Sequence, residues 1–348
     1  MKTKITIAGI SALAALASFN LIAQPRYSDW SEPLNLGPVI NTGFNDQHPA
    51  LSKDGLSLYL TSNRPGGYGA DDIWVSHRAS LDDPWGPPQN LGPTINTGAV
   101  EFSPAFSRDG HWLFFHSDRP GGFGGLDIWV SYREHVHDDF SWELPINLGS
   151  GVNTAFDDGG PTLFEDEDTG VTTLIFTSNR PGVAGAADIF TALMNPDGSF
   201  GPSAVVPELS SPGRDTRTAI RHDGLEIIFQ SDRTGSVGSG DLWVSTRATT
   251  LEPWSTPVNV GPTVNTIYFD GAPALSSDGE TLIFYSNRPG GFGANDLYMS
   301  TRHKLRDHDE SGAETVSKES ELHSSLGPAS CPKVTRPDPD SAKKGKRR

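Results

Sequence analysis

The sequence has a single cysteine, no long hydrophobic segment beyond its first residues, and a deficit of positive charge. Cys331 is the only cysteine among 348 residues, which excludes an intramolecular disulfide framework and a metal site built from several thiolates. Lys and Arg number 27 against 43 Asp and Glu, a formal net charge of −16 at pH 7. Because an acidic protein repels nucleic-acid phosphates, we expect no nucleic-acid partner.

The N-terminus has the features of a secretory signal peptide. Two lysines within the first four residues precede a largely apolar run that ends near Ala17, and small and polar residues follow up to Ala23. The apolar run is shorter than the ~20 residues that span a bilayer. We therefore predict a signal peptide over residues 1–23, an exported protein that is periplasmic or secreted, and no transmembrane segment after cleavage.

Glycine and proline are abundant, with 38 and 27 residues, which favours a turn-rich β protein. The stretch from Ser62 to Trp74, which contains Asn-Arg-Pro-Gly-Gly, returns from Ser117 to Trp129 and three more times. The arginines of the five copies are 55, 61, 53 and 55 residues apart, slightly more than the ~40–50 residues of common propeller repeats. The sequence therefore contains five copies of one structural unit.

Each copy contains four short extended runs separated by turn residues. In the first copy these runs are Pro49–Ser52, Leu58–Ser62, Ile73–Arg78 and Trp85–Leu91. Radial repetition of a four-stranded antiparallel unit protects the edges of the sheets. We predict an all-β, five-bladed β-propeller over residues 24–302. Its blades are expected at about 46–92, 101–149, 158–207, 215–261 and 270–302 plus 30–37.

The fifth copy lacks an outer strand, because it stops at Arg302. The missing pattern is present near the N-terminus, where Trp30 begins a segment that matches the outer strands of the other copies. We therefore predict that residues 30–37 close the ring by joining the last blade. Residues 303–348 are rich in charged residues, Ser and Pro without strand periodicity, which predicts a disordered tail.

These repeats resemble the WD-like β-propeller repeats of the TolB type. The resemblance rests on the Ser-x-Asp-Gly hairpin, the Ser-Asn/Asp-Arg strand end and the Asp-Ile/Leu-Tyr/Trp strand start, and it covers residues 30–302. It implies a stand-alone propeller. It implies little about activity, because the same repeat serves in transport scaffolds, envelope proteins and enzymes.

One acidic residue stands at an equivalent position of every copy. These five ring acids are Asp46, Glu101, Asp158, Asp215 and Asp270. We expect them around the mouth of the central channel, on the face that also holds the Asn-Arg-Pro-Gly-Gly loops, which we call the upper face. One interpretation is a metal or ligand site, for which Ca²⁺ is the expected ion because hard cations take carboxylate oxygens. The other is that each acid accepts backbone N–H bonds from its own connector. The sequence otherwise requires no cofactor.

A second repeated pair joins each arginine to an aspartate eight residues later, from Arg64 and Asp72 in the first copy to Arg288 and Asp296 in the last. The constant offset predicts one loop conformation in all blades, with the arginine bound to a carboxylate or to loop carbonyls. We interpret this pair as structural.

Residues that differ between the copies are better candidates for a ligand site. Beside the ring acids these are His48, Gln47, Phe102, Arg214, Arg217 and Tyr268. They combine polar groups with apolar walls, which is the usual composition of a ligand pocket.

The sequence favours a monomeric, non-catalytic propeller whose upper face binds a protein, a peptide or a cell-envelope glycan. It favours a binding protein over an enzyme because no glycosidase motif is recognisable. The alternative is a glycoside hydrolase that uses carboxylates around the channel, with Glu101, Asp46 and Asp270 as catalytic candidates. Such chemistry needs two carboxylates about 5–9.5 Å apart, which a ring of acids could supply.

Overall fold

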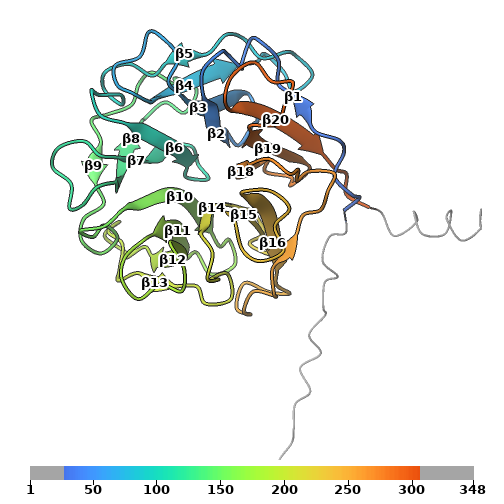
Figure 1. Cartoon of the computed structure of the whole chain (residues 1–348). Helices are drawn as coiled ribbons and strands as arrows, with labels where there is room; N and C mark the ends of the chain where they lie inside the picture. The colour runs from blue at the N-terminus through green and yellow to red at the C-terminus, as the bar shows by residue number, and fades with distance from the viewer. Residues whose placement is uncertain (1–26, 306–348) are drawn as a thin grey trace, which may run out of the picture. The chain divides into compact units, whose positions relative to one another are not determined.

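The computed structural model describes residues 27–305, in which every regular element is a β-strand. The strands form five four-stranded antiparallel sheets arranged around a central axis (Figure 1). This confirms the predicted five-bladed β-propeller. Within residues 27–305 there is no helix that could span a membrane. The predicted signal peptide and the predicted tail from residue 306 onward lie outside the described residues.

Each sheet runs from an innermost strand at the channel to a short outer strand at the rim. The innermost strands are β2 (Asp46–Leu51), β6 (Glu101–Phe106), β10 (Asp158–Glu165), β14 (Asp215–Ile220) and β18 (Asp270–Leu275). The second strands are β3 (Ser57–Ser62), β7 (Trp112–Ser117), β11 (Thr172–Ser178), β15 (Glu226–Ser231) and β19 (Thr281–Ser286). The third strands are β4 (Asp72–His77), β8 (Asp127–Tyr132), β12 (Asp188–Leu193), β16 (Asp241–Thr246) and β20 (Asp296–Thr301). The outer strands are β5 (Gln89–Asn90), β9 (Ile146–Asn147), β13 (Ala204–Val205), β17 (Val258–Asn259) and β1 (Leu34–Asn35).

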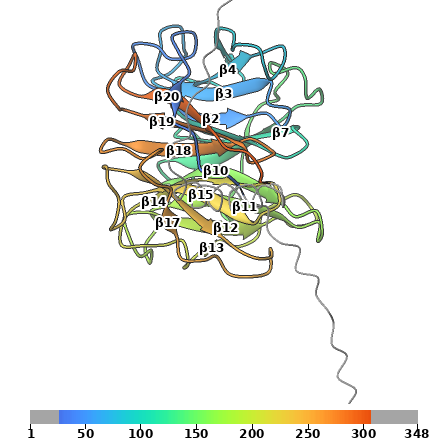
Figure 2. The ribbon, with the colours of Figure 1, turned by 90° about the vertical axis from the view of Figure 1, so that its right-hand side faces the viewer.

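The innermost strands begin earlier than the sequence pattern predicts. In the first blade β2 begins at Asp46, three residues before the expected Pro49, and a β-bulge follows its first two residues. At the bulge His48 has a φ of 49°, which is uncommon for a residue other than glycine. The bulge directs this residue into the channel, where it lines the central cavities. In the side view of Figure 2, strands such as β2, β3 and β18 run across the propeller between its two faces.

The hydrophobic core lies between neighbouring blades. At the boundary between the last and first blades, Leu60 and Trp74 pack with Ile283 and Leu297. Full burial of an aliphatic side chain of this size contributes about 1.5–3 kcal/mol. Each blade is therefore stabilised mainly by the faces of its two neighbours.

The last glycine of the repeated loop explains how closely the blades approach one another. A Cβ atom on Gly69 would lie 1.9 Å from the carbonyl oxygen of Ala99, in the connector of the next blade. Only glycine allows this contact. The equivalent glycines, each facing a backbone carbonyl of the next connector, are Gly124, Gly185, Gly238 and Gly293.

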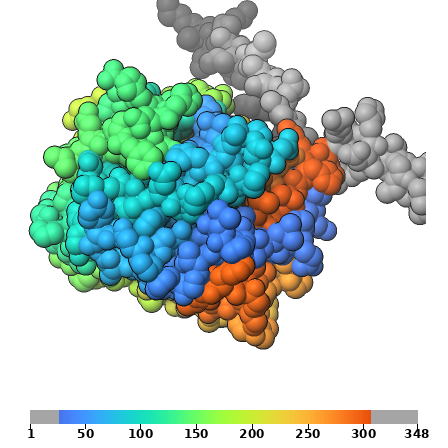
Figure 3. All heavy atoms as spheres, turned by 90° about the horizontal axis from the view of Figure 1, so that it is seen from above, coloured from blue at the N-terminus to red at the C-terminus, as the bar shows by residue number. Residues whose placement is uncertain are grey.

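The N-terminal segment closes the ring, as predicted. Strand β1 pairs with β20, with Leu34 opposite Met299, and the space-filling view shows the blue N-terminal segment against the orange-red last blade (Figure 3). The Trp30 ring lies 4.3 Å from the guanidinium of Arg302. Beyond Arg302, Lys304 forms an antiparallel bridge with Tyr27.

Candidate functional site

The five ring acids are completely buried and fully bonded. In the second blade, Glu101 accepts hydrogen bonds from the backbone N–H of Thr97 at 2.9 Å, from the Thr97 hydroxyl at 2.7 Å and from the Arg119 guanidinium at 2.9 Å. The other four acids each accept a bond from the Thr or Ser four residues earlier and from the arginine of the following loop. Each ring acid thus ties its own connector to its own loop, as the second interpretation of the sequence required.

None of the ring acids lines a cavity of the channel. The catalytic candidates Glu101, Asp46 and Asp270 therefore lie behind the channel wall rather than in it. Among the described residues, no group of three or more His, Cys, Asp or Glu side chains is placed so that it could hold a metal ion. The Ca²⁺ that the sequence suggested for the ring has no open carboxylate oxygens to bind there.

The repeated arginine does not pair with the aspartate eight residues after it. Arg64 forms its ion pair with Asp46 and also donates to the Ile40 carbonyl at 2.7 Å. Asp72 instead accepts the backbone N–H groups of Tyr68 at 2.5 Å and Gly69 at 3.0 Å. The pair is structural, but its two members support two different segments of the upper face.

The centre of the channel is formed by the five bulge residues, which differ in every blade. These are His48, Ser103, Gly160, Arg217 and Ala272, all with φ between 46° and 59°. They separate two cavities, an upper cavity of about 330 Å³ and a lower cavity of about 480 Å³. His48 and Arg217 line both. The five blades therefore present five different residues to the channel axis.

The upper cavity brings together three of the six residues that the sequence proposed as ligand-binding. His48, Arg214 and Arg217 line it. Phe102 lies beside it in the channel wall, where its ring contacts the His48 ring at 5.6 Å between centroids. Gln47 accepts a hydrogen bond from Asn295 at 3.3 Å. Tyr268 lines neither cavity and is exposed on the upper face.

Sequence comparison of the innermost strands alone misses three further residues of this centre. Gln230 and Tyr285 line the upper cavity, and the His116 ring stacks on Phe102 at 5.5 Å. All three occupy the last-but-one position of a second strand, opposite the residue that follows the ring acid. The sequence contains a signal for them, because this position is Thr in two copies and His, Gln or Tyr in the other three, while the serine after it is repeated in all five.

Burial keeps both central histidines neutral. Loss of hydration, followed by repulsion from Arg217, holds the pKa of His48 and that of His116 well below the usual value. His116 Nδ1 accepts the backbone N–H of Gly160 at 3.2 Å, so its proton is on Nε2. Burial raises the pKa of Tyr285 to about 12. Arg217 is therefore the charged group at the centre of the channel.

Asp71 is a carboxyl group that the sequence analysis did not single out. It precedes β4, and its Oδ1 atom is buried without a hydrogen-bond partner among the described residues. Burial, followed by repulsion from Asp72, raises its pKa from 3.8 to about 6. The equivalent residue of the fourth blade, Gly240, lines the upper cavity, and that of the last blade, Asn295, contacts the side chain of Gln47. This places Asp71 at the upper mouth of the channel.

Replacing Asp71 with asparagine should stabilise the protein relative to the wild type at pH 8 but not at pH 4. The native carboxyl group keeps its proton to a higher pH than the unfolded one, so native stability falls as pH rises from about 4 to about 6. Asp71→Asn removes this loss. We expect the melting temperature of the variant to equal that of the wild type near pH 4 and to exceed it by about 2–4 °C at pH 8. A constant difference at all pH values would contradict the raised pKa.

No protein-family model matches the sequence, and a search of curated proteins found no match. Solved structures do share the fold. An α-L-arabinofuranosidase from Lactobacillus brevis matches with a TM-score of 0.55 and 14% identity over 78% of this chain and 93% of that chain. An endo-arabinase from Bacteroides thetaiotaomicron matches with a TM-score of 0.54 and 15% identity, covering 77% of this chain and 98% of that chain. A mutant of the GH43 protein BlXynB from Bacillus licheniformis matches with a TM-score of 0.53 and 13% identity, over 79% of this chain and 54% of that chain.

At these identities the similarity establishes the fold, a five-bladed propeller of the kind found in glycoside hydrolases. It does not confirm the TolB-type resemblance, because these neighbours are glycoside hydrolases. It also contradicts the expectation from the sequence, which favoured a binding protein over an enzyme. That expectation depended on the absence of recognisable glycosidase motifs, and 13–15% identity leaves little sequence pattern to recognise.

Proposed function

We propose that the protein is a glycan-active enzyme of the glycoside hydrolase type that binds its substrate on the upper face, over the mouth of the channel. The observation that carries the proposal is a set of exposed aromatic side chains on this face, in the loops and connectors around the mouth. They are Phe44, Tyr68, Phe123, Phe156, Tyr268 and Phe292, each between 37% and 52% exposed. Clustered exposed apolar side chains mark binding surfaces, and sugar rings present C–H faces that pack on aromatic rings.

These aromatic residues come from neighbouring blades. The close approach of Gly293 to the Phe44 carbonyl brings Phe292 beside the connector that carries Phe44. Gly124 approaches the Phe156 carbonyl in the same way and brings Phe123 beside that connector. At the boundary between the third and fourth blades the corresponding residues are Ala184 and Gly213, so neither of these two positions carries an aromatic ring. A glycan could lie across the aromatic side chains with its reacting end over the polar upper cavity.

Asp71 has the properties of a general acid at this site. Hydrolysis of a glycosidic bond requires a carboxylic acid that keeps its proton near neutral pH and a second, ionised carboxylate. The raised pKa of Asp71, about 6, suits the first role. We propose Asp118 for the second, because its Oδ1 accepts the N–H of Val100, the residue whose backbone bridges with Asp71. Asp118 is exposed, which leaves it accessible to water or substrate.

The proposal is tested by measuring sugar release from arabinan, arabinoxylan and xylan, the glycan types suggested by the enzymes that share the fold. We expect the protein to hydrolyse at least one of these polymers or the matching aryl glycosides. Asp71→Asn should lower kcat by a factor of about 10²–10⁴, the usual contribution of a general acid. The matched control is Asp82→Asn, at an exposed position in the loop that follows β4, whereas Asp71 precedes that strand. No hydrolysis by the wild type, or equal rates in Asp71→Asn, would overturn the proposal.

A further inference from the structure

The lower cavity contains a cation without a counter-ion. Arg217 forms no ion pair with any described residue and no described side chain accepts a hydrogen bond from its guanidinium. The group extends from the fourth blade across the third, since a Cβ atom on Gly160 would lie 2.7 Å from Arg217 Nη1. Burial lowers its pKa from 12.5 to about 10, so it still carries its charge at neutral pH. Arg217 is half-buried. A charge that has lost part of its hydration without gaining a partner is costly, and an anion would offset that cost.

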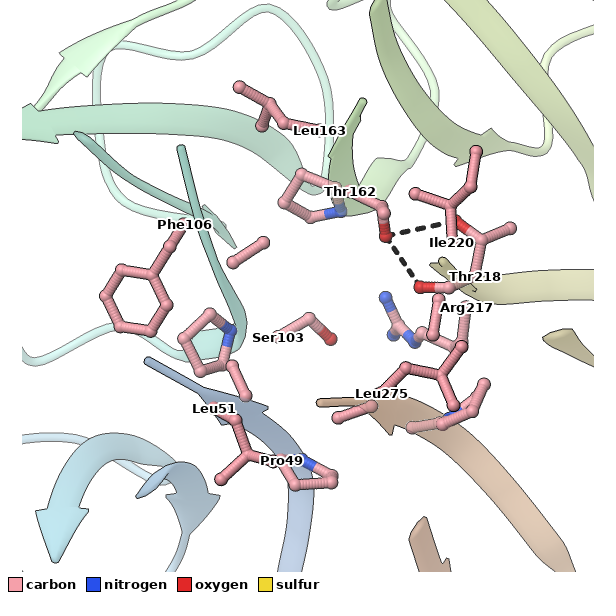
Figure 4. Close-up of a pocket in the computed structure, with 18 of the residues that line it drawn as sticks. Pro49, Leu51, Ser103, Phe106, Thr162, Leu163, Arg217, Thr218, Ile220 and Leu275 are labelled. Atoms are coloured by element: carbon pink, nitrogen blue, oxygen red, sulfur yellow. Dashed lines mark hydrogen bonds between the residues drawn. The ribbon is translucent and has the colours of Figure 1, made fainter. Parts of the chain in front are cut away.

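Polar atoms without partners lie beside this cation. Ser103 Oγ and His48 Nδ1 are both buried and make no hydrogen bond with the described residues. In the close-up of the cavity, the Ser103 hydroxyl and the Arg217 guanidinium point into the same space from opposite sides (Figure 4). Buried polar groups are normally bonded. The Arg217 guanidinium and the Ser103 hydroxyl thus provide donors for a compact anionic group at the inner end of the cavity. His48 adds a third donor in the tautomer that carries its proton on Nδ1.

The outer part of the lower cavity is apolar. Five residues at one equivalent position of the innermost strands surround it: Leu51, Phe106, Leu163, Ile220 and Leu275. Between them and the bulge residues, the wall is formed by four prolines and by small side chains. The hydrogen bond from Thr162 to the Thr218 carbonyl at 2.6 Å joins blades three and four. The cavity of about 480 Å³ is within the usual size range of small-molecule sites.

The entrance on the lower face holds one cation without an ion-pair partner among the described residues, although the protein is acidic. Lys53 lies at the rim of the cavity, is exposed, and forms no ion pair with a described residue. Arg108 and His222 also line the rim, together with the carboxylate of Asp278. Arg108 forms an ion pair with Glu167 at 2.5 Å, so Lys53 supplies the uncompensated charge. Asp278 accepts hydrogen bonds from Ser276 and from the backbone N–H of Glu280. Local positive charge raises the concentration of anions at an entrance.

We infer that the lower cavity is a binding site for a small amphipathic anion, a carboxylate with an aliphatic or aromatic body. Its carboxylate binds at Arg217 and Ser103, and its apolar body lies against the five apolar side chains that lead to the lower face. The site is separate from the glycan site proposed on the upper face and does not depend on it.

Octanoate, with 1-octanol and sodium chloride as comparison ligands, tests this inference by calorimetric titration of the full chain. We expect octanoate to bind, 1-octanol to bind at least about tenfold more weakly, and chloride to compete only weakly, because the charged hydrogen bond and the apolar wall act together. Arg217→Met should weaken octanoate binding by about tenfold or more, and Arg217→Lys by less. Both variants keep an unbranched side chain at the same bulge, and Arg217→Met should melt at or above the wild-type temperature because it removes the unpaired charge.

Arg214→Gln is the matched control, since Arg214 is exposed and lines only the upper cavity. It should leave octanoate binding within about twofold of the wild type. Equal binding of octanoate and 1-octanol, loss of binding in Arg214→Gln but not in Arg217→Met, or absence of octanoate binding would each overturn the inference. If chloride at the same concentration as octanoate displaced the bound octanoate, the cavity would hold an adventitious ion only. This result would also overturn the inference.

Discussion

Replacing Asp46 with alanine is expected to destabilise the propeller by about 3–5 kcal/mol, the cost of leaving a buried ionic partner uncompensated. Asp46 is completely buried and accepts hydrogen bonds from the Thr42 hydroxyl at 2.8 Å, from Ser62 at 2.6 Å and from Arg64. Its removal frees the connector before β2 and leaves the Arg64 guanidinium without its carboxylate. Thermal unfolding should show a decrease of about 10 °C in melting temperature, or the variant should be insoluble.

The control for this experiment is Asp82→Ala. Asp82 lies in an exposed loop of the same blade, so its replacement should change the melting temperature by less than about 1 °C. If Asp46→Ala instead melts within about 2 °C of the wild type, the ring acids are not the connector ties described above.

Deleting residues 24–37 is the second change with a large expected effect. The deletion removes β1, so the edge of β20 and the apolar face beneath it become exposed to solvent. It also removes the hydrogen bond from Asn35 to Asp296 at 3.0 Å and the contact of Trp30 with Arg302. We expect insoluble protein or a melting temperature at least about 10 °C lower.

A chain that ends at residue 305 provides the comparison, because it keeps every contact within residues 27–305. From the polar composition of the C-terminal segment, we expect it to melt within about 2 °C of the full chain. Closure by the N-terminal strand would be disproved by a soluble deletion protein that unfolds at the wild-type temperature.

The blade architecture could be predicted from sequence because it depends on signals that recur five times. The Asp-Gly hairpins, the alternating strands and the displaced outer strand at Trp30 each follow from local periodicity. The partner of the repeated arginine could not be predicted. Arg64 has one carboxylate eight residues after it and another eighteen residues before it, Asp72 and Asp46. Both offsets are constant in most blades, so only the folded geometry selects Asp46.

The central site was predicted only in part, because the sequence does not show which side chains face the channel. Which side chains face the channel depends on the β-bulge at each innermost strand, since a shift of one residue moves a side chain to the opposite face. His48 and Arg217 were proposed because they differ between the copies beside the ring acids, and the structure places both on the bulges. Gln230 and Tyr285 reach the same cavity from second strands, and Asp71 reaches its mouth from a loop. Their roles follow from contacts between segments that are distant in the sequence.

The central claim is that the repeated carboxylates hold the propeller together, whereas a carboxylate present in one blade acts on the substrate. Melting temperature and glycan hydrolysis measured together on Glu101→Gln and Asp71→Asn test it most directly. In Glu101→Gln the new amide N–H₂ would face the N–H of Thr97, now bonded to Oε2 at 2.9 Å, so a lower melting temperature is predicted. For Asp71→Asn the account predicts a higher melting temperature at pH 8 and loss of hydrolysis. The contradictory result would be a Glu101→Gln protein with wild-type stability and no hydrolysis, beside an Asp71→Asn protein that remains fully active.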